Sequence, residues 1–202
     1  MIRPFGESAL LIELESADQA QALAATLRAD PPAGVLESVP GLASLLVELD
    51  PLTANQDLVA AAIRRELRNS GPAPPAGRLH AIPVHYDGPD LAEVADLTGL
   101  SPSDVIARHA RTELRVLFCG FAPGFAYLGE LPPELRVERL STPRTRTPAG
   151  SVAIAGSMSG IYPADLPGGW RVIGRTEVGM FDPRQDPPAL LLSGDRVRFE
   201  PA

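Results

Sequence analysis

Three arginines are the side chains in this sequence best suited to bind an anion. Arg144 and Arg146 lie two residues apart in Pro143-Arg-Thr-Arg-Thr-Pro-Ala-Gly150, so they point to the same side if that segment is extended. Arg175, in Ile173-Gly-Arg-Thr176, is a candidate third member from another strand. Because guanidinium groups bind carboxylate and phosphate through paired N–H donors, the cluster predicts a site for an acidic substrate or a nucleotide. The alternative is that each arginine forms an exposed ion pair with a nearby Asp or Glu.

An aromatic loop is the second candidate site. Gly120-Phe-Ala-Pro-Gly-Phe-Ala-Tyr-Leu128 combines three aromatic residues with a Pro-Gly turn that fixes the backbone. Aromatic rings on such a loop can form the wall of a ligand pocket or grip a partner, and they can equally fill the mouth of a barrel. The residues expected to contact substrate or a partner here are Phe121, Pro123, Gly124, Phe125 and Tyr127.

Two later turns are expected to close the same face. Gly160-Ile-Tyr-Pro163 contributes Tyr162, and Pro167-Gly-Gly-Trp170 contributes Trp170, the single tryptophan of the chain. Two preceding glycines give the Trp170 ring access that a bulkier backbone would deny. An equally open alternative is that Trp170 fills the interior of the barrel.

Histidine and cysteine offer few other options for catalysis. His109 lies late on a predicted helix, where it is a candidate acid or base. Cys119 is the only cysteine, and a lone cysteine at the end of an apolar strand is more often buried than reactive. No Cys/His set has the spacing of a zinc site, so no metal is expected. Neither common glycine-rich phosphate-binding pattern occurs in the sequence.

Composition limits the classes of partner. The chain has 202 residues and a formal net charge of -7, which argues against general affinity for nucleic acid or for anionic membrane. It has no basic stretch followed by an apolar core at its start and no apolar run long enough to span a bilayer, so we expect a cytoplasmic protein. The 22 prolines and 18 glycines favour a turn-rich β architecture for at least part of the chain.

The first part of the chain has a β-α-β-β-α pattern. Short apolar runs predict strands, and apolar residues at helical spacing predict helices, the first of them capped by Ser16 or Asp18. A further strand over Leu79–Val84 would complete a ferredoxin-like unit, or it could open the next domain. The elements expected here are strands over 9–14, 34–39 and 44–49 and helices over 18–29 and 55–69.

A proline-rich linker over Gly71–Gly77 separates this part from the rest, which gives domains of residues 1–77 and 78–202. In the second domain, short helices are expected over 90–97 and from Ser101 to about Arg111, with Ser101 as a cap. Short strands separated by turns then predict a small, closed or nearly closed β-barrel. These strands are expected near 114–119, 152–155, 170–174, 189–192 and 196–199.

The same motifs resemble those of the family of 5-oxoprolinase B subunits, also described as allophanate hydrolase subunit 1 or KipI-like. The resemblance extends over essentially the whole chain and rests on many ordered segments. Besides those above, they include Phe5-Gly-Glu-Ser-Ala-Leu-Leu11, Ser44-Leu-Leu-Val47, Ile82-Pro-Val84 and Pro148-Ala-Gly-Ser-Val152. The resemblance implies an α+β chain, with a ferredoxin-like α/β domain followed by a cyclophilin-like β-barrel domain.

The resemblance also implies a function inside a complex. In bacterial 5-oxoprolinase this subunit works with a C subunit and an A subunit, and the complex opens 5-oxoproline to glutamate at the expense of ATP. The arginine cluster, with His109 as acid or base, would then act on the substrate, and the chain is expected to be nearly inactive alone.

Two alternatives follow from other members of the family. One is acyl or carboxyl transfer, as in the related half of urea-metabolising enzymes. The other is KipI-like inhibition of a sensor histidine kinase, in which Phe121, Phe125 and Trp170 would line a groove for a proline-containing segment.

Overall fold

The computed structural model describes residues 1–68 and 77–202. The chain divides into two compact units, Met1–Pro75 and Ala76–Ala202, which are considered separately below. The predicted linker over Gly71–Gly77 lies outside the described residues except for Gly77 itself.

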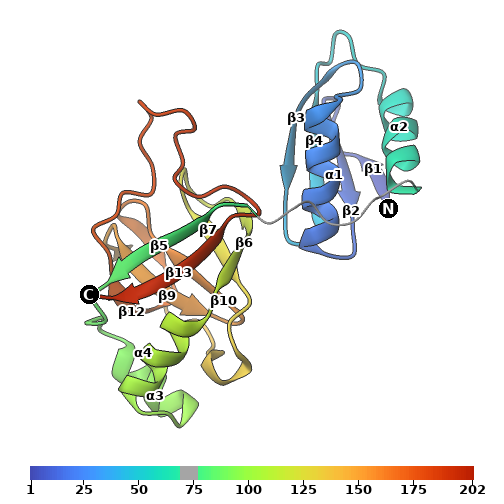
Figure 1. Cartoon of the computed structure of the whole chain (residues 1–202). Coiled ribbons are helices and arrows are strands. Elements are labelled where there is room, and N and C mark those ends of the chain that lie inside the picture. The colour runs from blue at the N-terminus through green and yellow to red at the C-terminus, as the bar shows by residue number, and fades with distance from the viewer. Residues whose placement is uncertain (69–76) are drawn as a thin grey trace. The chain divides into compact units, whose positions relative to one another are not determined.

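The first unit is a four-stranded antiparallel sheet with two helices packed on one face. The strand order is β1-β2-β4-β3 (Figure 1). Apolar residues alternate along the central strands, so that Leu45, Val47 and Leu49 are buried beneath the helices. The Ser16 hydroxyl accepts a hydrogen bond from the Gln19 amide and caps the first helix. The elements are β1 (Ile2–Pro4), β2 (Ala9–Glu13), α1 (Ala17–Ala29), β3 (Val35–Pro40), β4 (Ser44–Leu49) and α2 (Gln56–Arg68).

The β-α-β-β-α prediction is confirmed for this unit, apart from shifts of one residue at several ends. Strand β1 is an addition that the sequence pattern did not indicate, because it contains only three residues. It pairs with β2 at an edge of the sheet. The sequence left open which unit contains Leu79–Val84, and the structure places it in the second. The unit is a mixed α/β structure, and its ferredoxin-like topology stays a prediction.

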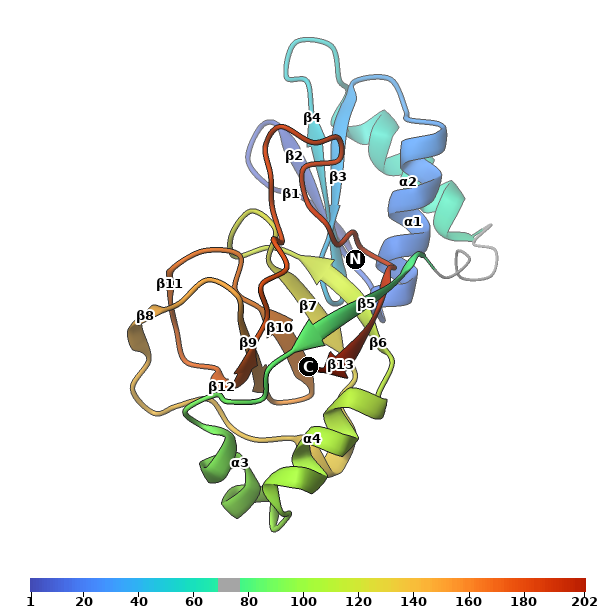
Figure 2. The same cartoon turned by 60° about the vertical axis from the view of Figure 1, so that its left-hand side comes forward.

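The second unit contains a seven-stranded sheet that curves into a nearly closed barrel (Figure 2). The strand order is β12-β9-β10-β7-β6-β13-β5, so the edge strands are β12 and β5. A separate ribbon is formed by β8 and β11. The strands are β5 (Leu79–Val84), β6 (Leu114–Cys119), β7 (Ala126–Gly129), β8 (Arg144–Thr147), β9 (Ser151–Ala155), β10 (Met158–Ile161), β11 (Leu166–Gly168), β12 (Arg171–Arg175) and β13 (Arg196–Pro201).

The barrel closes where the chain leaves β5 and runs beside β12. His85 and Arg175 exchange two backbone hydrogen bonds of 2.9 Å, and the Gly88 and Asp90 amides donate to carbonyls of β12. The approach is so close that a methyl group on Gly88 would lie 2.3 Å from the Ile173 carbonyl carbon. The segment after β5 therefore needs glycine at this position.

Two helices pack together at one end of the barrel, below the strands in Figures 1 and 2. They are α3 (Leu91–Thr98) and α4 (Pro102–Arg111), and a short 3₁₀ turn, η1 (Pro133–Leu135), packs beside them. The predicted cap is confirmed, since the Ser101 hydroxyl accepts from the Asp104 amide at 3.1 Å. These elements and the barrel strands share one apolar core, which includes Val94, Val105 and Phe199.

The strand predictions for this unit were partly wrong. Residues 189–192 form no strand, and Ala189 makes only an isolated bridge to Phe181. The apolar run was misleading because proline on its N-terminal side and turns on both sides interrupt regular pairing. The structure also adds β7, β8, β10 and β11, which are short and rich in glycine, proline or arginine. Within the described residues, no helix is both long and apolar enough to cross a membrane.

Candidate functional site

A pocket of about 250 Å³ lies beside the barrel closure and contains two of the three predicted arginines. One wall is the segment after β5, another is β8 with the turn that follows, and the third is β12. Its exposed wall is mainly apolar. The lining residues are Asp87, Gly88, Pro89, Arg144, Thr147, Pro148, Ala149, Ser151, Val172, Gly174 and Arg175.

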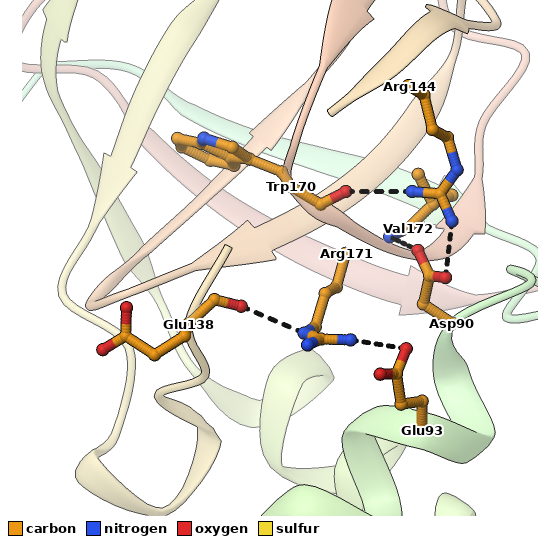
Figure 3. A network of polar contacts seen from close by, with 7 residues as sticks. All are labelled: Asp90, Glu93, Glu138, Arg144, Trp170, Arg171 and Val172. Carbon is orange, nitrogen blue, oxygen red and sulfur yellow. Dashed lines mark hydrogen bonds and ion pairs between the residues drawn. The ribbon is translucent and has the colours of Figure 1, made fainter. Parts of the chain in front are cut away.

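Arg144 is held in the pocket by a buried carboxylate (Figure 3). Its Nη2 donates to Oδ1 of Asp90 at 2.6 Å, and its Nη1 donates to the Trp170 carbonyl oxygen at 3.4 Å. The other Asp90 oxygen accepts the Val172 amide at 2.6 Å. The Asp90 side chain is only 7% exposed. Removing one partner of such a buried pair typically costs about 3–5 kcal/mol, so this pair fixes the arginine and the wall together.

Arg175 has a much more open environment. Its Nε donates to Oδ2 of Asp87 at 3.0 Å, and the two side chains are 54% and 53% exposed. Exposed pairs of this kind contribute about 0–1 kcal/mol. The backbone of Arg175 is nevertheless fixed by its pairing with His85. The residue therefore combines a rigid backbone with a side chain that can change partners.

Arg146 does not line the pocket. Its guanidinium bonds the carboxylate of Asp165, which also accepts the Ala149 amide at 2.9 Å. The Ala149 amide and, after it, Arg146 lower the pKa of Asp165. Arg146 thus supports the turn that forms one wall. All three arginines have carboxylate partners, but only the pairs of Arg146 and Arg175 are exposed, as the alternative interpretation of the cluster expected.

The predicted aromatic site is mostly interior. Phe125, Tyr162 and Trp170 are buried and form one apolar cluster, with edge-to-face contacts from Phe125 to the other two rings. Tyr127 joins this cluster and also stacks on Phe118 at 4.1 Å. Burial raises the pKa of Tyr162, which keeps the phenol neutral. In Figure 3 the ring of Trp170 points away from Arg144, and only its carbonyl oxygen faces the arginine.

Phe121 is the exception in the aromatic loop. It is 59% exposed and makes an edge contact with Phe125 at 5.4 Å. Its φ of 71° is the only positive value at a residue other than glycine in the described chain. Such a backbone is unfavourable for a bulky residue. Gly124, also at positive φ, lies close to the backbone of Met180. Pro123 immediately precedes it in the loop.

His109 is fully buried inside the second unit and is not among the residues of the pocket. Its Nδ1 lies 2.8 Å from the Tyr86 hydroxyl and its Nε2 lies 2.9 Å from Oγ of Ser159, while the ring stacks on Phe199. Ser159 donates to the Ala153 carbonyl, so its oxygen is placed to accept from Nε2. Burial lowers the pKa of His109 to about 3. The ring is therefore neutral at ordinary pH.

The sequence interpretation missed the carboxylates of the site. Asp87 and Asp90 flank Gly-Pro in Tyr86-Asp-Gly-Pro-Asp90, and that pair of aspartates around a turn was the available signal. Asp90 precedes α3 but makes no side-chain cap, because both oxygens serve the pocket wall.

Arg171 was missed as well. Its side chain is only 9% exposed. Its Nη1 lies 2.5 Å from Oε2 of Glu93 in α3, and its Nε donates to the Glu138 carbonyl oxygen at 3.0 Å (Figure 3). These contacts connect strand β12 to the helices at the end of the barrel.

Comparison with known proteins identifies relatives over the whole chain. The family described as carboxyltransferase domain, subdomain C and D, matches residues 1–191. The 5-oxoprolinase B subunit of Escherichia coli O157:H7 is 41% identical in an alignment 204 positions long, which covers 97% of this chain and 93% of the relative. The protein of the same name from Bacillus subtilis (strain 168) is 36% identical in an alignment 218 positions long, which covers 98% of this chain and 91% of the relative.

Solved structures share the fold. The crystal structure of TTHA0988 is 39% identical, with a TM-score of 0.84 over 100% of this chain, and this chain spans 40% of that longer protein. The Kluyveromyces lactis urea carboxylase is 22% identical, with a TM-score of 0.78 over 100% of this chain and 21% of its own, which shows a common fold. The family match over residues 1–191 and the identity to the two B subunits establish that the chain belongs to the family of 5-oxoprolinase B subunits, among the carboxyltransferase subdomain C and D proteins.

Proposed function

We propose that this chain is the B subunit of a 5-oxoprolinase, which opens the lactam of 5-oxoproline to give glutamate. The observation that carries the proposal is 41% identity to a 5-oxoprolinase B subunit over 97% of the chain. A protein of this kind implies partners, and we assign these as a C subunit and an A subunit. The substrate class agrees with the pocket, which offers guanidinium groups to an acidic molecule.

The pocket is proposed to position the substrate by its carboxylate. Arg175 would bind the carboxylate, and Arg144, whose charge is balanced by Asp90, would hold its N–H donors at a fixed place in the wall. Donors that are already ordered stabilise charge without reorganising during the reaction. His109 has no direct route to this substrate, because its ring is buried and outside the pocket lining. An acid or base for lactam opening would then come from elsewhere in the complex.

ATP is assigned to the complex and not to this pocket. The pocket volume is about 250 Å³, whereas sites for larger organic ligands typically measure ~300–1,000 Å³. A nucleotide with its phosphates is larger than the compact ligands that a volume of this size suits. The pocket suits a compact acid.

The test is ADP release in the presence of 5-oxoproline, measured for the chain alone and mixed with its candidate C and A subunits. Activity in the mixture and not in the separate chains is the expected result, because the reaction is proposed to need all three. If ADP release is also absent from the mixture while the subunits assemble, the assignment of 5-oxoproline is wrong.

Carboxyl transfer to an amide nitrogen is a second candidate, favoured by the description of the matching family. It predicts that the assembled proteins consume a carboxylated donor in preference to 5-oxoproline. The same purified mixture, offered both substrates, distinguishes the two reactions.

KipI-like inhibition of a sensor histidine kinase is a third candidate, and the exposed Phe121 ring favours it. Phe125 is only 2% exposed and is unsuited to direct contact with a partner. Under this proposal, Phe121→Ala weakens kinase binding and leaves ADP release by the complex unchanged. Kinase binding that is insensitive to this substitution would exclude the loop as the contact.

A further inference from the structure

The two ion pairs of the pocket differ in how easily their carboxylates can be exchanged. Asp90, the partner of Arg144, is buried and also accepts a backbone amide. Asp87, the partner of Arg175, is more than half exposed, as is the arginine. Water can hydrate the charges of the exposed pair when it separates, whereas the charges of the buried pair would be left without a partner. Asp87 is therefore the carboxylate that an incoming anion can displace.

The Arg175 guanidinium has donors available for a better contact than the present one. Within the described residues its side chain makes one hydrogen bond, from Nε to Asp87. A guanidinium carries five N–H donors, and its strongest contacts to carboxylate use two parallel bonds. A ligand carboxylate that enters the pocket can make this two-bond contact, which gives it an advantage over Asp87.

The remaining walls indicate what the carboxylate is attached to. Pro89, Pro148 and Val172 contribute to a wall that is mainly apolar, and the volume suits a compact molecule. A second anionic group would meet Arg144 already neutralised by Asp90. Shape and charge together favour a small molecule with one carboxylate on an apolar ring or short chain.

We propose that Asp87 is an internal counter-ion of Arg175, which a small monocarboxylate displaces when it binds. The choice of 5-oxoproline as the natural ligand rests on the proposed function, but the displacement itself does not. Every ligand must bind Arg175 more strongly than Asp87 does, so Asp87 lowers the affinity for all anions. It excludes those that would bind Arg175 through a single hydrogen bond. Asp87 is thus a residue that sets specificity.

The experiment is calorimetric titration of the full chain with two acids, 5-oxoproline and cyclopentanecarboxylate, and with the neutral cyclopentanecarboxamide. Arg175→Gln should weaken both acids by about tenfold or more, because a charged hydrogen-bonding partner is lost. Asp87→Asn should tighten both acids by about two- to fivefold, the range expected from removal of an exposed competing ion pair. The neutral amide should bind weakly and respond to neither change.

Asp182 and Arg184 supply matched controls, because they form an ion pair outside the pocket in which the arginine side chain is 87% exposed and the aspartate 28%. Asp182→Asn and Arg184→Gln make the same changes in charge and should leave the affinity for both acids as it is. Equal effects from the control pair would attribute the result to net charge and overturn the proposal.

Other outcomes separate this inference from the proposed function. Weaker or unchanged binding in Asp87→Asn contradicts displacement, and tighter binding of inorganic phosphate than of either acid overturns the ligand class. If neither acid binds and KM for 5-oxoproline in the assembled complex is unchanged by Asp87→Asn and Arg175→Gln, the pocket is not the site, although the complex can still be a 5-oxoprolinase. Tighter binding of cyclopentanecarboxylate by Asp87→Asn, without turnover of 5-oxoproline, supports displacement and rejects the proposed function.

Discussion

The two ends of strand β12 lie in different surroundings. Just before the strand, Trp170 is buried among aromatic rings, whereas at its other end Arg175 is half exposed at the pocket. Only a few residues separate an anchor of the core from a side chain available to a ligand. Arg171, at the start of the same strand, is only 9% exposed, so position along the strand, more than residue type, decides between a structural and a binding role here.

The most direct test of this contrast is to remove each end in turn. Trp170→Ala should lower the free energy of unfolding of the second unit by about 3–5 kcal/mol, the usual cost of deleting a large buried aromatic side chain. Arg175→Ala should cost no more than about 1 kcal/mol, because its ion pair is exposed. Denaturant unfolding of both variants measures the difference. Similar losses in the two variants would contradict the contrast between the two ends.

His109 extends the buried side of the comparison and makes it depend on pH. Burial lowers the pKa of the folded residue to about 3, whereas the ordinary value is 6.5. Between these values the unfolded chain binds the proton and the folded chain does not, so stability falls as the pH falls. The slope from this residue is about 1.4 kcal/mol per pH unit over the steepest part of that window.

His109→Gln removes this contribution while keeping polar atoms near Tyr86 and Ser159. The free energy of unfolding of the variant, measured from pH 7 to pH 4, should decline less steeply than that of the natural chain. Subtracting the two curves isolates His109 from the carboxylates that also titrate. Parallel curves would show that the pKa of His109 is the same in the folded and the unfolded chain.

The smallest expected change in stability is at Phe121, which is an exposed residue and so belongs to the other side of the comparison. At a positive φ, glycine is favoured over alanine, in contrast to most positions of a folded chain. Phe121→Gly should therefore be more stable than Phe121→Ala by about 1 kcal/mol. Thermal unfolding of the two variants side by side is sufficient. A more stable alanine variant would mean that the backbone at this residue is not left-handed.

Local pattern predicted much of the fold, and distant contacts decided the rest. Helical spacing gave α1 and α2, and the Ser101 cap gave the start of α4, because each depends on neighbours along the chain. The pairs of the pocket join residues 54 and 88 positions apart, which no local pattern reveals.

The arginines were recognisable by type, but their environments were not. Nothing in Pro143-Arg-Thr-Arg146 tells which arginine faces the pocket, since that depends on pairing between β8 and β11. In the same way, the sequence could not tell that Phe125 is buried and Phe121 exposed. Burial follows from the chain that covers a side chain, and this information is spread over the whole unit.

The closure between His85 and Arg175 couples the barrel to the pocket. Asp87 and Gly88 belong to one side of the join and Gly174 and Arg175 to the other, so an occupant of the pocket touches both. A molecule that binds only the joined form favours it by mass action. The bound molecule would then act as a further cross-link across the barrel. The measured affinity for that molecule would include the free energy of keeping β12 paired with the segment after β5.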